Sequence, residues 1–389
     1  MEAERSRERA PRVVSIVGTR PEAIKLGPVI RALRDHGGFE QQVIMTGQHR
    51  GLAAGFDSLP CSNVTELPVN PAEQSAGELR DAIHDSLCRH LRREEADLVL
   101  VQGDTSSAYA GALAARDRGI ALAHVEAGLR SFDLQQPWPE EGYRIAIDHL
   151  SDLLFAPTEA AVRNLKSEPR VRGAVHLTGN SGIDALFDVL RTLPPAAPPE
   201  SRRKRILVTC HRRENRGDPL RRVAEACRRL VRELPVEIVL PLHGSPVARR
   251  SVLRLLGREP HVHLIDPLDY RGMVELMTSS WLILTDSGGI QEEAPALGRP
   301  VLVLREVTER EEAVSSANAE LVGTDADRIV NAVSRLIADE SRYATMSRPN
   351  LPFGDGRASE RIVTAISAFF ARPPSERQLA APVPLPCFA

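Results

Sequence analysis

WLILTDSGGIQEEAP, residues 281–295, is the stretch that decides the fold. Its first four residues are apolar and bounded like a buried strand, a polar corner follows, and Ile290 opens a helical pattern. Glycines let a ligand approach the backbone, and the free N–H groups and dipole of a helix start favour an anion. The stretch therefore predicts a phosphate site between a strand and a helix, built by Ser287, Gly288 and Gly289.

Two carboxylates follow the glycines at once and would repel a phosphate docked close to them. We therefore expect one of Glu292 and Glu293 to face away from the phosphate or to bind a hydroxyl group, for which a ribose diol is a natural partner. The alternative is an ordinary strand-to-helix turn, with Ser287 as N-cap and the glutamates as favourable first-turn charges. The local pattern leaves both interpretations open.

The composition limits the class of protein. A chain of 389 residues predicts two domains, and a formal net charge of −2 argues against a general nucleic-acid or membrane-surface binder. The sequence has no apolar run of membrane-spanning length, and its charged first residues lack the apolar core of a signal peptide. Five cysteines without CxxC pairs or zinc spacing indicate a reduced, cytoplasmic protein.

Strand and helix patterns alternate along the chain in two halves, which predicts an α/β protein of two Rossmann-like, doubly wound domains. The segment 51–73 between the second strand and the next helix reads as irregular. The predicted divisions are a first domain at 12–190, a proline-rich linker at 191–201, a second domain at 202–358, a last helix at 359–372, and disordered ends at 1–11 and 373–389.

Every polar cluster singled out follows a predicted strand, and ligands of such sheets bind beyond the carboxyl ends of the strands. We therefore expect the clusters to face one cleft between the two domains. The sequence contains no GxGxxG dinucleotide fingerprint and no GxxxxGK[ST] P-loop, nor GxSxG or HExxH. The ligand is thus expected to carry phosphate and to be held without these devices.

The first cluster is cationic. Arg20 and Lys25 flank the first predicted helix start and would supplement a backbone anion site. The chain has lysine at three positions and arginine at nearly every other basic position, so Lys25 is considered as a functional residue. A solvated surface pair is the alternative.

The second cluster is acidic and comprises Asp104, Glu126 and Glu140. Asp104 has a simpler explanation as cap of a helix beginning at Thr105, whereas Glu126 precedes Ala-Gly where no helix pattern starts. Carboxylates crowded in a cleft push their pKa values apart, which leaves one as acid and another as base. Two histidines, His211 and His243, follow strands of the second half and are expected to reach the ligand from its far side, with a structural or surface role as the alternative.

Together these motifs resemble the non-hydrolysing UDP-N-acetylglucosamine 2-epimerases. The matches run in order over roughly residues 12–335 and comprise GTRPEAIK (18–25), TGQHR (46–50), GDT (103–105), HVEAGLRS (124–131), PWPEE (137–141), APTE (156–159), TGN (178–180), HRREN (211–215) and TDSGGIQEEAP (285–295). The resemblance implies a fold of the glycosyltransferase-B type, with UDP in the interdomain cleft and the last helix crossing back to the first domain. It also implies a homodimer and no cofactor or metal.

The reaction implied is anti elimination of UDP to a 2-acetamidoglucal, followed by re-addition on the opposite face of C2. By matching position, Asp104, Glu126 and Glu140 would be the acid/base carboxylates, and His211 would assist the diphosphate leaving group. The resemblance further implies ligand-binding roles for Arg20 and Lys25 at the phosphate or sugar, for Ser287, Gly288 and Gly289 at the phosphate, for Glu293 at the ribose, and for His243 at the cleft lining.

The chain departs from the family pattern at several positions. Met273 stands where the family usually has an aromatic residue against uracil, and Tyr143 lies in a changed sequence after PWPEE. These changes bear on the accepted sugar more than on the reaction. The alternatives are a relative acting on a modified UDP-sugar, a hydrolysing 2-epimerase that releases ManNAc and UDP, a glycosyltransferase of the same fold, and a UDP-sugar sensor without turnover.

Overall fold

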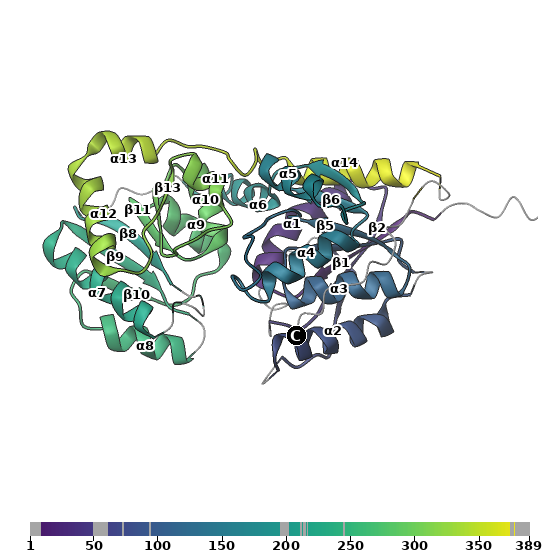
Figure 1. The fold of residues 1–389 in the computed structure, drawn as a ribbon, viewed down its shortest axis with the longest axis horizontal. Coiled ribbons are helices and arrows are strands. Elements are labelled where there is room, and N and C mark those ends of the chain that lie inside the picture. The colour runs from purple at the N-terminus through teal and green to yellow at the C-terminus, as the bar shows by residue number, and fades with distance from the viewer. Residues whose placement is uncertain are drawn as a thin grey trace, which may run out of the picture. The chain divides into compact units, whose positions relative to one another are not determined.

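The computed structural model describes residues 9–49, 61–71, 74–92, 95–194, 202–210, 212, 215, 217–243, 246–373 and 377. The chain divides into two compact units (Figure 1). Unit 1 comprises Met1–Ala185 together with Gly354–Ala389, and unit 2 comprises Leu186–Phe353. Within the described residues, no helix is long and apolar enough to cross a membrane.

Unit 1 is built on a parallel sheet whose described strands run in the order β3-β2-β1-β4-β5-β6-β7. Its strands are β1 (Arg12–Val17), β2 (Glu40–Met45), β3 (Val64–Glu66), β4 (Leu98–Gln102), β5 (Ala121–Val125), β6 (Leu153–Ala156) and β7 (Ala174–Leu177). Its helices are α1 (Arg20–His36), α2 (Ala76–His90), α3 (Ser106–Asp117), α4 (Glu140–Leu150), α5 (Glu159–Ser167), α6 (Ser181–Leu190), which runs on into unit 2, and α14 (Ala358–Ala371).

Alternation along the strands places a core on each face of this sheet. Val13 and Val17 of β1 pack in the cluster that includes side chains of α1 and α14, whereas Val14 and Ile16 pack in the cluster of α2, α3 and α4. Helix α14 packs against α1, so the last helix belongs to unit 1 although it follows unit 2 in the sequence.

Unit 2 repeats the architecture on a second parallel sheet, with its described strands in the order β10-β9-β8-β11-β12-β13. The strands are β8 (Lys204–Thr209), β9 (Val236–Pro241), β10 (Val262–Ile265), β11 (Leu282–Thr285), β12 (Val301–Val303) and β13 (Ala319–Leu321). The helices are α7 (Asp218–Glu233), α8 (Pro246–Leu256), α9 (Tyr270–Thr278), α10 (Gly288–Ala296), α11 (Glu311–Ser315), α12 (Ala326–Ala338) and α13 (Glu340–Met346).

Each sheet has a point where the strand order reverses, between β1 and β4 in unit 1 and between β8 and β11 in unit 2. Such switch points are where doubly wound sheets bind ligands, beyond the carboxyl ends of the strands. The turns at these two places carry Gly18–Arg20 and Gly103–Thr105 in unit 1, and Asp286–Gly288 in unit 2. The topology therefore puts several predicted site residues where a ligand is expected.

Strand β3 was not predicted, because Val64–Glu66 lies in the segment expected to be irregular. It is a three-residue edge strand with the exposure pattern of a surface segment, and it gains its structure from pairing with β2. So short a strand has no periodicity of its own to read. Of the predicted linker, residues 195–201 lie outside the described residues, as do most residues of the two predicted disordered ends.

Candidate active site

The turn after β1 is organised by a buried carboxylate, Glu22. Thr19 caps α1 in a capping box, and Glu22 Oε2 accepts from the backbone N–H groups of Gly18 at 2.7 Å and Thr19 at 2.6 Å. The other carboxylate oxygen accepts from the hydroxyl of Thr105, the residue that caps α3. Glu22 thus joins the β1–α1 turn to the β4–α3 turn, across the switch point.

Burial raises the pKa of Glu22 from 4.5 to about 7, although the hydrogen bonds from Thr105, Gly18 and Thr19 oppose the shift. The desolvation of a carboxylate that is 1 % exposed outweighs its three donors. The group at the centre of these two turns therefore titrates near neutral pH.

Asp104 follows β4 directly, and Thr105 rather than Asp104 caps α3. The alternative explanation of Asp104 as a helix cap is therefore wrong. Its side chain is 28 % exposed and forms an ion pair with Arg144 of α4, which donates from Nε at 3.0 Å and from a terminal nitrogen. Arg144 also binds Glu141 at 2.8 Å, so it holds Asp104 beside the first turn of α4.

Glu126 begins the turn after β5 in a left-handed backbone conformation, with φ of 73°. A non-glycine residue held there stores strain, which persists where the surroundings fix it. Lys25 forms an ion pair with the Glu126 carboxylate, and Gln102 Nε2 donates to the same oxygen at 2.6 Å. Gln102 lies two residues before Asp104, so the two carboxylates sit on adjoining strand ends.

Lys25 was expected at the phosphate or sugar, and the structure pairs it with Glu126. Both side chains are nearly buried, with exposed fractions of 10 % for Lys25 and 7 % for Glu126. The cation is thus part of the carboxylate cluster. Arg20 is the first residue of α1 and is partly exposed.

The two consecutive glutamates at the start of α4 have different surroundings. Glu141 is fully buried and accepts from the backbone N–H groups of Ser131 at 2.9 Å and Phe132 at 3.1 Å, which holds that loop. Glu140 is the first residue of α4 and keeps partial exposure. Glu140 is therefore the more exposed member of the pair, at the start of the helix whose Arg144 binds Asp104.

A buried network behind these turns was not predicted. His124 Nε2 donates to the carbonyl of Gly103 at 2.8 Å, and Nδ1 lies 2.7 Å from Asp148 Oδ1. Asp148 also accepts from Gly128 N–H at 3.1 Å and pairs with Arg130 at 2.7 Å. The network fixes the residue before Asp104 and the turn that follows Glu126.

Burial alone would raise the pKa of Asp148, but the charges of Arg130 and His124 outweigh it and hold that pKa below its usual value. Asp148 is therefore an ionised acceptor, and both ring nitrogens of His124 face groups that accept hydrogen bonds. A rigid frame of this kind holds reacting groups in place.

In unit 2, Asp286 ties the turn after β11 to the turn after β8. Its carboxylate accepts from the backbone N–H of Arg212 at 2.9 Å and from the Asn215 side chain at 2.8 Å. Ser287 is the N-cap residue of α10, but its side chain forms no capping hydrogen bond. The alternative interpretation is therefore right that Ser287 is the N-cap residue and wrong that the glutamates lie in the first turn, which contains no acidic residue.

The two glycines at the start of α10 differ in the space around them, because Gly288 faces a neighbouring side chain and Gly289 faces open space. A methyl group at Gly288 would lie 2.8 Å from the Arg310 guanidinium carbon, whereas one at Gly289 would meet nothing within 4 Å. The Arg310 guanidinium is paired with Glu292 and Glu309, so the attraction for an anion at this helix start comes from its backbone N–H groups.

The two glutamates of α10 point to different partners. Glu292 is buried and bonded to Arg310 at 2.9 Å, so its charge is matched inside unit 2. Glu293 accepts from the Tyr270 hydroxyl at 2.9 Å, and burial together with the Glu293 charge raises the pKa of Tyr270. Each carboxylate therefore has a hydrogen-bonding partner within unit 2.

His243 follows β9, is exposed, and lines a cavity of about 290 Å³ together with Cys210, Arg212 and Asn215. The interior of the cavity is apolar, formed by side chains of α7 and α8. His211, predicted to assist a diphosphate leaving group, lies outside the described residues.

Several residues that organise the site were missed for identifiable reasons. The Thr-x-x-Glu spacing of Thr19 and Glu22 is a capping-box pattern and offered a signal. Gln102, His124 and Asp148 offered none, because their contacts join segments far apart in the sequence.

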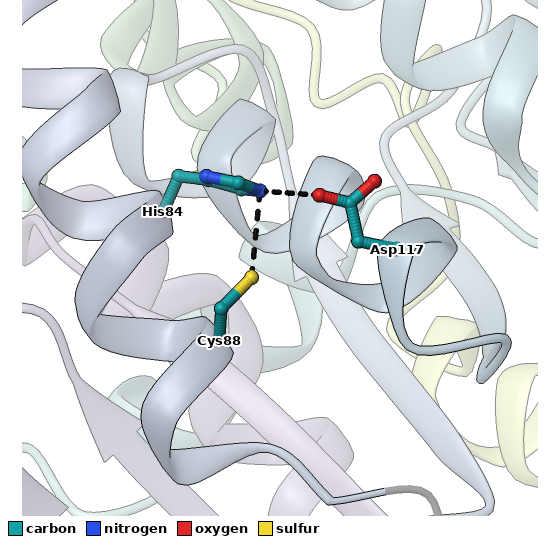
Figure 2. Close-up of side chains that lie close together, drawn as sticks. All are labelled: His84, Cys88 and Asp117. Atoms are coloured by element: carbon teal, nitrogen blue, oxygen red, sulfur yellow. Dashed lines mark hydrogen bonds and ion pairs between the residues drawn. The ribbon is translucent and has the colours of Figure 1, made fainter.

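Among the described residues, one cluster could hold a metal ion, namely His84, Cys88 and Asp117 on α2 and α3 (Figure 2). It contains none of the predicted site residues.

Two doubly wound units, each with polar side chains at its switch point, are the fold of the glycosyltransferase-B type that the sequence predicted. Comparison with known proteins then places the chain more closely. The sequence profile of the family described as UDP-N-acetylglucosamine 2-epimerase matches residues 31–367. The chain is 43 % identical over 369 residues to the UDP-N-acetylglucosamine 2-epimerase of Escherichia coli K12, covering 91 % of this chain and 98 % of that protein.

Solved structures agree. The chain matches the UDP-GlcNAc 2-epimerase from Neisseria meningitidis bound to UDP-GlcNAc with a TM-score of 0.86 and 39 % identity, over 92 % of this chain and 100 % of that one. It matches the S. aureus MnaA–UDP co-structure with a TM-score of 0.87 and 39 % identity, over 93 % and 97 % of the two chains. The chain belongs to the UDP-N-acetylglucosamine 2-epimerase family, which confirms the resemblance seen in its motifs.

Proposed function

We propose that this enzyme interconverts UDP-GlcNAc and UDP-ManNAc by epimerisation at C2. The observation that carries the proposal is the position of Asp104 and Glu126 after the neighbouring strands β4 and β5 of unit 1. Relatives of the chain carry this activity in their names. Removal of the C2 hydrogen as a proton requires a carboxylate against C2, and its return to the opposite face requires a second group.

The proposed mechanism begins with cleavage of the C1–O bond, which builds positive charge on the sugar and makes the C2 hydrogen acidic. A carboxylate of the set Asp104, Glu126 and Glu140 takes that proton to give the 2-acetamidoglucal. UDP then adds back while a carboxylate returns a proton to the other face of C2. The hydrogen leaves and returns as a proton, so the reaction has no redox step.

The surroundings of these carboxylates support their assignment. Arg144 orients Asp104 from the side of α4, and Lys25 with Gln102 orients Glu126, so each group has a fixed direction. Reacting groups that are already oriented lower the activation barrier, because they do not have to be ordered during the reaction.

Unit 2 is proposed to bind UDP. The N–H groups at the start of α10, at Gly288 and Gly289, favour the diphosphate. Glu293 would accept a ribose hydroxyl in exchange for, or beside, its bond from Tyr270. His243 would line the pocket, and His211 would assist the leaving diphosphate on the strength of its motif alone.

Incubation with UDP-GlcNAc in D2O, followed by NMR, tests the proposal. Epimerisation predicts the manno isomer of the UDP-sugar with deuterium at C2. Free ManNAc with UDP would identify a hydrolysing enzyme, and tight UDP-sugar binding without exchange at C2 would identify a sensor. Parallel incubation with a UDP-linked diacetamido uronic acid tests the modified-sugar alternative, which the change at Met273 motivates, whereas Tyr143 is buried in the core of unit 1 against Tyr109.

Two finer points belong to the same proposal. Assembly as a homodimer follows from the family resemblance and is tested by sedimentation. A cytoplasmic location is supported by the described cysteines Cys61, Cys88 and Cys227, which form no disulfide in the structure.

A further inference from the structure

Three side chains with metal-binding atoms converge on the side of unit 1 formed by α2 and α3. His84 and Cys88 lie one helical turn apart on α2, and Asp117 is the last residue of α3, which packs against α2. Figure 2 shows the His84 ring directed at both the Cys88 sulfur and the Asp117 carboxylate. Nε2 of His84 lies 2.9 Å from Asp117 Oδ2 and 3.5 Å from Cys88 Sγ.

The Cys88 sulfur also has the Arg118 side chain as a partner, and a hydrogen bond at Nε2 of His84 can serve Asp117 or Cys88 but not both at once. A neutral ring nitrogen carries either a hydrogen or a lone pair. With a hydrogen on Nε2, the ring donates to Asp117 and the Cys88 thiol has no lone pair to meet; without one, the nitrogen accepts from the thiol and faces the carboxylate lone pairs. A doubly protonated ring between Asp117 and Asp85, whose carboxylate lies 3.5 Å from Nδ1, still gives the thiol hydrogen no acceptor at the ring.

A metal ion satisfies all three groups at once, since each then directs a lone pair at the same centre. We propose that His84, Cys88 and Asp117 form a zinc site that bridges α2 and α3. The three donor atoms lie within 4.8 Å of one another, which suits bonds of about 2.0 Å to nitrogen and oxygen and about 2.3 Å to sulfur.

The donor set selects the kind of ion. One imidazole, one thiolate and one carboxylate suit Zn²⁺ or Co²⁺, whereas Ca²⁺ and Mg²⁺ take oxygen ligands. Three protein ligands leave a fourth tetrahedral position for water. The Asp117 side chain is 61 % exposed and that of His84 is 23 % exposed, so an ion and its water can reach the site without unfolding.

Neighbouring charges oppose one another at this place. Arg118 donates to the backbone carbonyl of Cys88 and puts a cation beside the site, whereas Asp85 adds a negative charge next to His84. A half-exposed site with one opposing cation is expected to bind an ion more weakly than a closed four-ligand zinc site.

The site is separate from the acid/base carboxylates. Asp117 stands at the opposite end of α3 from the turn that carries Asp104, and the helix rise puts the two ends about 17 Å apart. An ion there would join α2 to α3 and stabilise unit 1 without contacting substrate. The inference does not depend on the proposed function.

Cobalt binding to the purified full-length chain, stripped with a chelator and kept reduced, tests the site. We expect one Co²⁺ per chain and a thiolate-to-cobalt charge-transfer band that one equivalent of Zn²⁺ bleaches. Cys88→Ser and Cys88→Ala should both lose the band, His84→Gln should lose it, and Asp117→Asn should weaken binding by at least tenfold. Cys61→Ser and His90→Gln remove the same residue types elsewhere in unit 1 and should leave the band intact.

Thermal unfolding gives a second readout. Zn²⁺ at about one hundred times its dissociation constant should raise the midpoint of the wild-type chain by about 5 °C and leave that of Cys88→Ser unchanged. The proposal is overturned if no charge-transfer band forms, if the band survives Cys88→Ser, or if Zn²⁺ raises both midpoints equally. Metal-free midpoints that match between wild type and variants show that the variants fold.

Discussion

The buried carboxylate Glu22 makes a quantitative prediction about stability and pH. Its pKa is raised to about 7 in the folded chain from a value of 4.5, so folding favours the protonated form. The stability that Glu22 contributes is therefore full below pH 4.5 and is lost as the pH rises through 7. Between pH 5 and pH 8 the shift corresponds to about 2–3 kcal/mol.

Glu22→Gln removes this titration but keeps the shape of the side chain. The amide is a poorer acceptor for the N–H groups of Gly18 and Thr19, which adds a constant cost that does not change with pH. We therefore expect the stability of the variant, relative to wild type, to improve by about 2–3 kcal/mol from pH 5 to pH 8.

Hydrogen exchange followed by mass spectrometry measures this in unit 1 by itself, from the opening free energies of peptides covering β1 and β4. Glu78→Gln is the matched control, because Glu78 is the capping-box glutamate of α2 but is exposed, and hydrogen bonds from Ser75 lower its pKa. Its contribution is lost only as the pH falls below 4.5, so it should show no trend from pH 5 to pH 8. A flat or reversed trend for Glu22→Gln would refute the reasoning.

Two further variants test the frame behind the site. Gly128→Ala should destabilise unit 1 by about 2 kcal/mol or more, because Gly128 has φ of +85° and an added methyl group would lie 2.4 Å from the Ala161 carbonyl oxygen. The control Gly27→Ala, in an open helical position, should be neutral or stabilising. Equal melting midpoints for the two variants would contradict this prediction. His124→Gln loses one of the two contacts made by the imidazole ring, so kcat for epimerisation should fall on the order of 10²-fold while KM changes little. A change confined to KM would show that the ring does not position Asp104.

The fold was predictable because its signals are local. Apolar runs such as 281–284 give strands, and the glycine and proline positions at Gly288 and Pro21 give helix starts, so two doubly wound units follow from their order. β3 escaped because pairing with β2, and not its own three residues, creates it.

The site residues that follow strands were predictable from the sequence, whereas the buried residues that hold them in place were not. Asp104 and Glu126 stand directly after strands, and polar residues there are exposed to a ligand in any sheet of this kind. Arg144 lies 40 residues from Asp104, and Asp148 lies 24 residues from His124, so no short pattern marks either contact. Lys25 drew notice as a rare lysine, but its partner Glu126 is 101 residues away.

Deuterium incorporation at C2 by single-carboxylate variants tests the central claim most directly. Asp104→Asn and Glu126→Gln should each lose nearly all exchange of the C2 hydrogen in D2O while they bind UDP as tightly as wild type, because UDP is assigned to unit 2. Glu78→Gln, which changes an exposed carboxylate in the first turn of α2, should exchange at the wild-type rate. Near wild-type exchange by either Asp104→Asn or Glu126→Gln would contradict the assignment of that residue to proton transfer.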